Sequence, residues 1–65
     1  MSADNVIYIK NIKKLFYVWH DFMSHDPTYK NNKTLKKYKT RNGAINYAKK
    51  LNVEWTTEYG IVFLN

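Results

Sequence analysis

Several residue types that stabilise or anchor small proteins are scarce in this chain of 65 residues. It has no cysteine, which excludes disulfide bonds and thiolate metal sites. No apolar run approaches the roughly 20 residues that span a bilayer, and residues 1–5 lack the charged and apolar regions of a signal peptide. We therefore expect a single domain, residues 1–65, without a membrane partner.

Acidic residues are also few, and this shortage sets the charge. Five Asp and Glu stand against eleven Lys and Arg, so the net charge is +6. Such a balance excludes an acidic mimic of DNA and favours attraction to phosphate. The alternative is that the lysines reflect an AT-rich genome and solubility.

The cations are concentrated in residues 30–41, KNNKTLKKYKTR, of which six are basic and none is acidic. This block predicts a partner that is nucleic acid or a nucleoprotein. A solvated loop without a ligand and a protein-docking loop are the alternatives.

Periodicity predicts the fold class. Residues 6–10, 15–22 and 60–64 are β-branched and aromatic and read as strands, the first two forming a hairpin. Residues 24–37 read as a long polar loop, in which Leu35 is the only aliphatic residue. We expect an α+β fold in the order β-β-α-β, with one helix on one face of a small antiparallel sheet of three or four strands.

The helix is predicted over residues 41–51. Thr40 is a plausible N-cap, and Ala44, Tyr47, Ala48 and Leu51 form one apolar face. We expect Asn52 to end the helix, and residues 53–56 to be a short strand or a connector. Gly43 in the first turn suggests close approach of the backbone to a strand or a ligand.

Alternation along the two hairpin strands sorts their side chains onto two faces. If Ile7, Ile9 and Val18 face the helix, then Tyr8, Tyr17 and Trp19 face away from it. Aromatic rings beside cations on an open sheet would resemble a platform on which single-stranded bases stack. The alternative is that the rings cover one another or that the long loop folds over them.

The sequence offers little for catalysis or metal binding. It has no Cys nucleophile, no glycine-rich phosphate loop and no recognisable serine triad, so we expect no enzyme, no cofactor and no small-molecule substrate. The repeated pair His20-Asp21 and His25-Asp26 has the residue types of a Zn²⁺ or Ni²⁺ site. Its spacing on a strand and a loop fixes no geometry, and we predict no metal.

Four short motifs, in their order and spacing, resemble a family of small uncharacterised bacteriophage and prophage proteins. They are SADNxIYI (2–9), YVWH (17–20), YKT (38–40) followed by Ala44 and Ala48, and TEYGI (57–61). The resemblance spans nearly the whole chain, except that the lysine-rich segment departs from a family often more acidic there. It implies phage origin and action in the cytoplasm of an infected bacterium, and no functional residue is carried over.

Together these observations lead to two hypotheses. The first is a non-enzymatic phage protein that inhibits a host nucleic-acid-handling or defence complex, of the anti-CRISPR or anti-restriction type. The second is a direct DNA- or RNA-binding module such as a phage regulator; a weaker third is an assembly protein that oligomerises through a sheet edge. The predicted contacts are the cations and aromatic anchors Lys33, Lys36, Lys37, Lys39, Arg41, Tyr17, Trp19 and Tyr38.

Overall fold

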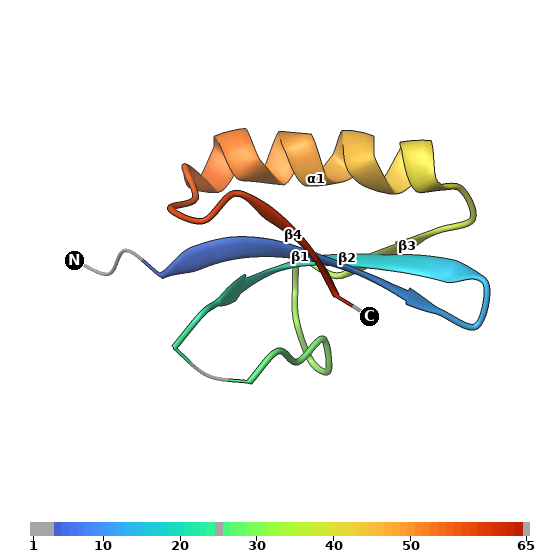
Figure 1. Cartoon of the computed structure of the whole chain (residues 1–65), viewed down its shortest axis with the longest axis horizontal. Coiled ribbons are helices and arrows are strands. Elements are labelled where there is room, and N and C mark those ends of the chain that lie inside the picture. The colour runs from blue at the N-terminus through green and yellow to red at the C-terminus, as the bar shows by residue number, and fades with distance from the viewer. Residues whose placement is uncertain (1–3, 25, 65) are drawn as a thin grey trace.

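A computed structural model of the chain describes residues 4–24 and 26–64 and shows a four-stranded sheet covered on one face by a helix (Figure 1). The elements are β1 (Asn5–Ile12), β2 (Leu15–Phe22), β3 (Lys36–Tyr38), α1 (Arg41–Trp55) and β4 (Ile61–Leu64). The predicted α+β class with one helix on a sheet is confirmed. The additional strand β3 lies at the end of the segment that was predicted as a loop.

The strands follow the order β3-β2-β1-β4 across the sheet. β1 and β2 pair in antiparallel fashion, as do β2 and β3, whereas β4 runs parallel to β1. The sheet is mixed because α1 carries the chain back over the sheet before β4 begins, and such a crossover joins strands that run in the same direction.

The hairpin between β1 and β2 closes through a two-residue turn. Ile12 pairs with Leu15, which leaves Lys13 and Lys14 as the turn residues. Both have positive φ angles, 49° and 71°. Positive φ at both positions defines the type I′ turn, whose twist matches that of the flanking strands and which Asn-Gly normally occupies.

Two apolar layers lie on the two faces of the sheet. On the helix side, Ile7, Ile9 and Val18 pack against Ala44 and its neighbours on α1, as the alternation predicts. On the opposite side, Val6, Tyr8 and Trp19 form a second buried cluster. A chain of this size therefore buries both faces of its sheet.

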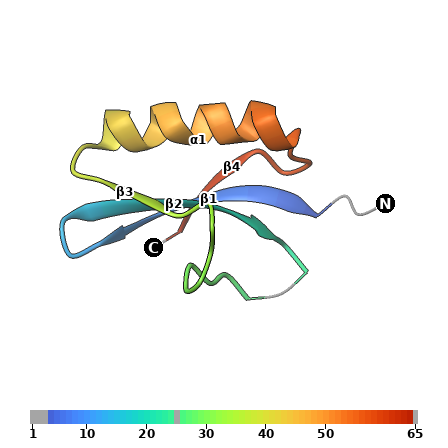
Figure 2. The same ribbon diagram turned by 180° about the vertical axis from the view of Figure 1, so that it is seen from behind.

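The loop between β2 and β3 covers this second face. Figures 1 and 2 show, from both sides of the molecule, that the loop and α1 lie on opposite faces of the sheet. Tyr29 brings its ring edge-on to Tyr17 at 5.0 Å and to Trp19 at 5.7 Å, and Leu35 packs on the same cluster. Of the two alternatives for this face, the structure shows the covered one and not the open platform: Tyr8 is 4% exposed and Trp19 is 1% exposed, because the loop shields them.

The helix begins as predicted but ends later. The Thr40 side chain accepts a hydrogen bond from the Gly43 backbone N–H at 3.1 Å, and a Cβ on Gly43 would lie 3.3 Å from the Tyr38 ring. The close approach expected at Gly43 is thus made to β3. The helix continues to Trp55, so the strand or connector expected over residues 53–56 is wrong. Thr56, with φ of 48°, takes the C-cap position expected for Asn52.

Candidate functional site

The hairpin turn, β3 and the start of α1 meet at one end of the molecule, on the right in Figure 1. Seven of the eleven basic residues of the chain lie on these segments or next to them. We call them the basic end: Lys10, Lys13, Lys14, Lys36, Lys37, Lys39 and Arg41.

No acidic residue belongs to this region. Asp4 precedes β1, Asp21 is near the end of β2, Glu54 is in the last turn of α1, and Glu58 lies between α1 and β4. Asp26 lies in the loop that follows β2. The long axis of the chain measures 35 Å, well beyond a Debye length of about 8 Å at physiological salt. The carboxylates at the far end therefore screen the basic end little.

The cations of the basic end are free to bind an anion. Within the described residues, none of the seven forms an ion pair. The first turn of α1, which begins with Arg41, also contains no acidic residue. The positive end of the helix dipole therefore adds to the charge of the side chains at this end.

Three of these cations lie over the faces of aromatic rings. Lys36 lies over the Tyr47 ring at 5.1 Å, Lys37 over the Tyr17 ring at 5.0 Å, and Arg41 over the Phe63 ring at 5.1 Å. Such contacts contribute about 0.5–1 kcal/mol at exposed sites. They restrict the side chains and so reduce the entropy lost when an anion binds.

The structure divides the predicted contact residues. Lys33, Lys36, Lys37, Lys39 and Arg41 are exposed, and the last four lie together in the basic end. Tyr17 and Tyr38 are half-buried, Tyr17 beneath Lys37 and Tyr38 beside Tyr47.

The prediction of Trp19 as an aromatic anchor has to be corrected, because its ring is buried and cannot serve as a surface anchor. Its indole N–H donates to Asp21 at 2.9 Å inside the fold. Sequence reasoning also missed Lys10, Lys13 and Lys14. The predicted hairpin placed Lys13 and Lys14 near a turn, but their approach to β3 depends on the pairing of β3 with β2.

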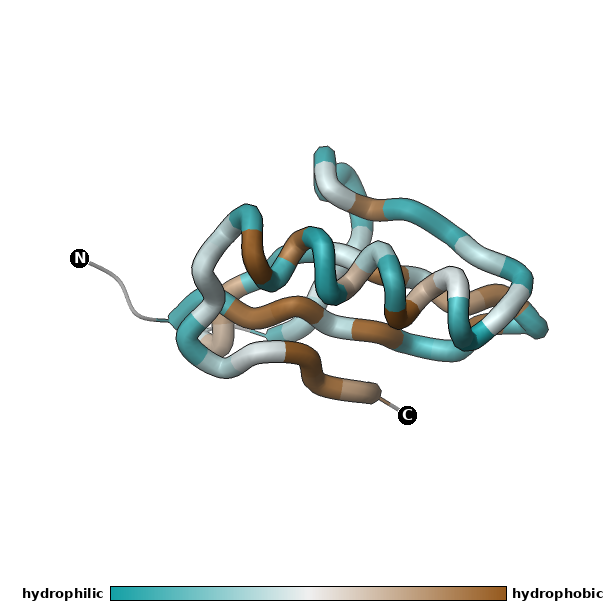
Figure 3. Tube along the Cα trace, turned by 90° about the horizontal axis from the view of Figure 1, so that it is seen from above, coloured by the Kyte–Doolittle hydropathy of each residue, from teal (hydrophilic) through white to brown (hydrophobic). Residues whose placement is uncertain are grey.

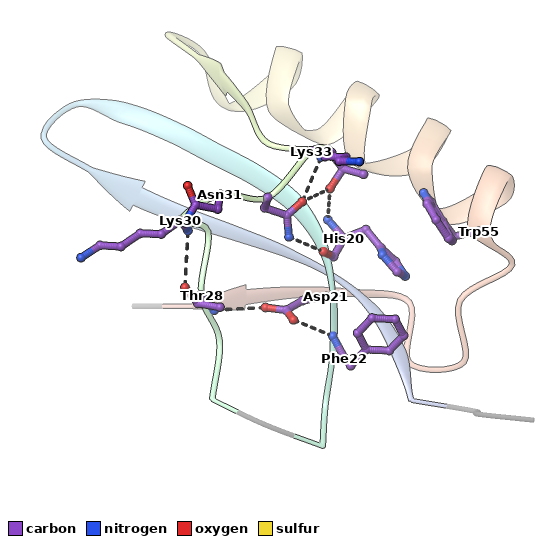
Figure 4. Close-up of a pocket in the computed structure, with 10 residues that line it drawn as sticks. His20, Asp21, Phe22, Thr28, Lys30, Asn31, Lys33 and Trp55 are labelled. Carbon is purple, nitrogen blue, oxygen red and sulfur yellow. Dashed lines mark hydrogen bonds between the residues drawn. The ribbon is translucent and has the colours of Figure 1, made fainter.

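A second feature is a pocket where β2 extends past β3, toward the opposite end of the molecule (Figure 4). It is open to solvent, with a volume of about 420 Å³. Its lining comes from β2, the loop and the end of α1, with His20, Asn31, Lys33 and Trp55 among the residues.

Loop side chains seal the edge of β2 at this pocket. The His20 backbone N–H donates to the Thr34 hydroxyl at 2.8 Å, and the His20 carbonyl accepts from the Asn32 amide at 2.9 Å. The Thr34 hydroxyl in turn donates to Asn32 Oδ1 at 2.6 Å. This network satisfies the backbone of an edge strand and fixes the wall of the pocket.

His20 forms the floor of the pocket and stacks on Trp55, with ring centroids 4.1 Å apart and planes 10° from parallel. Its Nε2 lies 2.9 Å from Asn5 Oδ1. Burial lowers the pKa of His20, and the nearby Asp21 only partly opposes this effect. The imidazole beneath Trp55 is therefore neutral at pH 7.

In the ranges 4–24 and 26–64, no three His, Cys, Asp or Glu side chains are grouped as metal ligands. His25 lies outside the described residues. Asp21 instead accepts hydrogen bonds from the backbone N–H groups of Phe22 and Thr28.

Large exposed apolar side chains gather near the end opposite to the basic end. We call Phe22, Met23, Val53, Trp55 and Tyr59 the apolar end. Among the exposed large apolar side chains of residues 4–24 and 26–64, only Phe63 on β4 lies apart from them. Figure 3 shows hydrophilic colour over the hairpin turn at the other end.

No helix in the described part of the chain is long and apolar enough to cross a membrane.

Comparisons with known proteins find no match. No family model, no curated protein and no solved structure matches the chain.

Proposed function

We propose that this protein binds nucleic acid by holding its phosphates at the basic end. The observation that carries the proposal is the gathering of seven cations, with no Asp or Glu among them, from segments far apart in the sequence. Release of counterions from the phosphate backbone would supply most of the affinity.

The hairpin turn supports this role. Lys13 and Lys14 occupy positions with positive φ, and an L-residue in this conformation costs roughly 1–2 kcal/mol relative to the usual regions. Asn-Gly would relieve that cost but would carry no charge. Local strain of this kind is concentrated at functional sites.

A titration of labelled single- and double-stranded DNA and RNA, at low and at physiological salt, tests the proposal. We expect binding whose logarithm falls linearly with the logarithm of the salt concentration. The variant Lys13→Gln/Lys14→Gln should reduce that slope by about 1.4–1.8, because each phosphate contact contributes about 0.7–0.9.

A matched variant separates site from net charge. Lys49→Gln/Lys50→Gln removes the same charge from exposed positions in the middle of α1 and should leave the slope nearly unchanged. Equal losses in both variants, or no binding at low salt, would contradict the basic end as the site.

The apolar end favours a second function, the phage inhibitor that the motifs suggest. Exposed Trp and Tyr side chains are typical anchors of protein interfaces, and a contiguous apolar surface indicates a binding partner. The partner would be a host protein or nucleoprotein complex that handles nucleic acid.

A purified host restriction or CRISPR nuclease provides the assay for this second function. Stoichiometric inhibition of the nuclease should be lost in Val53→Ala/Tyr59→Ala and kept in Lys49→Gln/Lys50→Gln. Inhibition unchanged in the first variant, or removed by excess DNA, would contradict docking through this end.

A further inference from the structure

We propose that the pocket beside Trp55 receives one unstacked base of a single-stranded nucleic acid, whose phosphates follow the edge of the sheet at β3. This inference rests on the proposed function and adds a strand preference to it. It uses a part of the molecule that lies outside the basic end.

A line of cations joins the two regions. Lys39 lies between β3 and α1, Lys36 lies on β3, and Lys33 lies on the loop that lines the pocket. All three are exposed. Arg41 does not belong to this line, because its side chain lies over Phe63 on β4, at the other edge of the sheet. A single strand that runs along this edge meets a cation at each step and reaches the pocket at its end.

Trp55 has the properties of a stacking surface. Its ring is 44% exposed, whereas Trp19 is 1% exposed. The stack on His20 holds the orientation of the indole ring, so little entropy is lost when a base lies against its exposed part. Aromatic stacking tolerates every base because each one has a π face.

The pocket walls supply polar groups for the edge of a base or for its phosphate. Within the described residues, the side chains of Lys30, Asn31 and Lys33 make no hydrogen bond or ion pair. Asn31 has a φ of 60°, a conformation that asparagine tolerates well. The tight turn that contains it is closed from the Asn32 backbone N–H to the Tyr29 carbonyl, and Lys33 follows this turn. Asn31 and Lys33 line the pocket together with Trp55, whereas the Lys30 side chain extends away from Trp55 (Figure 4).

A duplex does not satisfy this site. Its bases are stacked on one another, so that one of them reaches a pocket only after it leaves the stack at a cost of a few kcal/mol. Phosphates of a duplex can still contact the basic end. The two sites therefore predict different responses to strandedness.

The experiment compares Trp55→Ala with the unmodified protein, on a short labelled oligothymidylate and on a hairpin duplex of the same length. We expect about a 5- to 150-fold loss of affinity for the single strand and a change of less than about twofold for the duplex. Asn46→Ala, an exposed position on α1 that lies outside the pocket and outside both ends, is the control and should bind both as before. Thermal unfolding of each variant confirms that it folds.

Tryptophan fluorescence gives a second readout without any mutation. Oligothymidylate should quench the exposed Trp55, and Trp55→Phe, in which only the buried Trp19 emits, should lose that quenching. Equal losses on both nucleic acids, or quenching that persists in Trp55→Phe, would overturn the base site and leave the proposed function standing. Failure of the unmodified protein to bind either nucleic acid would overturn both, and specific loss of nuclease inhibition in Trp55→Ala would assign the pocket to a protein partner.

Discussion

The two ends of this molecule differ in their charge and in the way their side chains are held. The basic end is polar and contains no Asp or Glu, and five of its seven cations lie over aromatic rings or in a turn with positive φ. The apolar end is built around a loop that hydrogen bonds tie to β2, and there a neutral His20 supports an exposed Trp55. The first arrangement suits a partner with uniform charge, and the second suits a partner with a defined shape.

The difference shows how a chain of 65 residues can carry two sites. A domain of this size buries only about 60% of its unfolded surface, so it cannot enclose a deep cleft. Here the loop closes the second face of the sheet over Trp19, and the binding surfaces are moved to the ends of the long axis. Each end can then be changed with little effect on the other.

The largest effect is expected from a change to Trp19, because both ends depend on the core in which it lies. Trp19→Ala should reduce the free energy of unfolding by about 3–5 kcal/mol, because it empties the cluster under the loop and removes the indole hydrogen bond to Asp21. Urea unfolding followed by circular dichroism measures it. Trp55→Ala is the comparison and should cost far less, since that ring is half exposed; similar losses in the two variants would mean that the loop does not shield Trp19.

The next effect concerns the basic end alone. Lys36→Ala, Lys37→Ala, Lys39→Ala and Arg41→Ala combined should lower affinity for single- and double-stranded nucleic acid on the order of a hundredfold at physiological salt, since four phosphate contacts are lost. The four side chains are exposed, so the loss of stability should not exceed what the three cation–π contacts contribute, about 0.5–1 kcal/mol each. Fluorescence anisotropy checks the affinity, and a loss below about tenfold would rule out this choice of contacts.

A smaller change should separate stability from binding at the same end. Lys13→Asn/Lys14→Gly places the favoured type I′ residues in the turn and should raise the free energy of unfolding by about 1 kcal/mol. It should weaken nucleic-acid binding at the same time, because two cations are lost. Urea unfolding and a salt titration on one sample measure both quantities. A variant that is less stable than the parent would show that the turn holds no strain.

The sequence predicts the parts of the fold that depend on local patterns. The hairpin strands, the Thr40 cap and the face formed by Ala44, Ala48 and Leu51 follow from periodicity and capping, and all are confirmed. The full helix length was not predictable from that pattern, since Val53 and Trp55 are exposed and do not extend the apolar face.

The candidate site was less accessible to sequence reasoning. The lysine-rich segment was visible, but its meeting with Lys13 and Lys14 depends on the pairing of β3 with β2, which no local signal specifies. Whether Trp19 is buried or exposed depends on which face of the sheet the polar loop covers. Tyr29 and Leu35 decide that through long-range contacts, which composition does not show.

The smallest expected effect is a dependence of stability on pH that belongs to the apolar end. Burial lowers the pKa of His20 below its ordinary value of 6.5, while Asp21 raises it by less. The unfolded chain therefore takes up a proton at a higher pH than the folded chain does. Stability should be complete above about pH 6.5 and should fall as the pH drops from there toward the folded pKa.

Urea unfolding at pH 7.5 and at pH 5, for the parent and for His20→Gln, isolates this contribution. The parent should lose more stability on acidification than the variant does, because only the parent must charge an imidazole held between Trp55, Phe22 and the Asn5 amide. His20 lies in the pocket beside Trp55 and outside the basic end, so duplex binding per folded molecule should respond less to the His20 titration than base stacking at Trp55 does. If the parent instead gains stability relative to His20→Gln at pH 5, then the attraction of Asp21 for the charged imidazole outweighs the desolvation of His20 by burial.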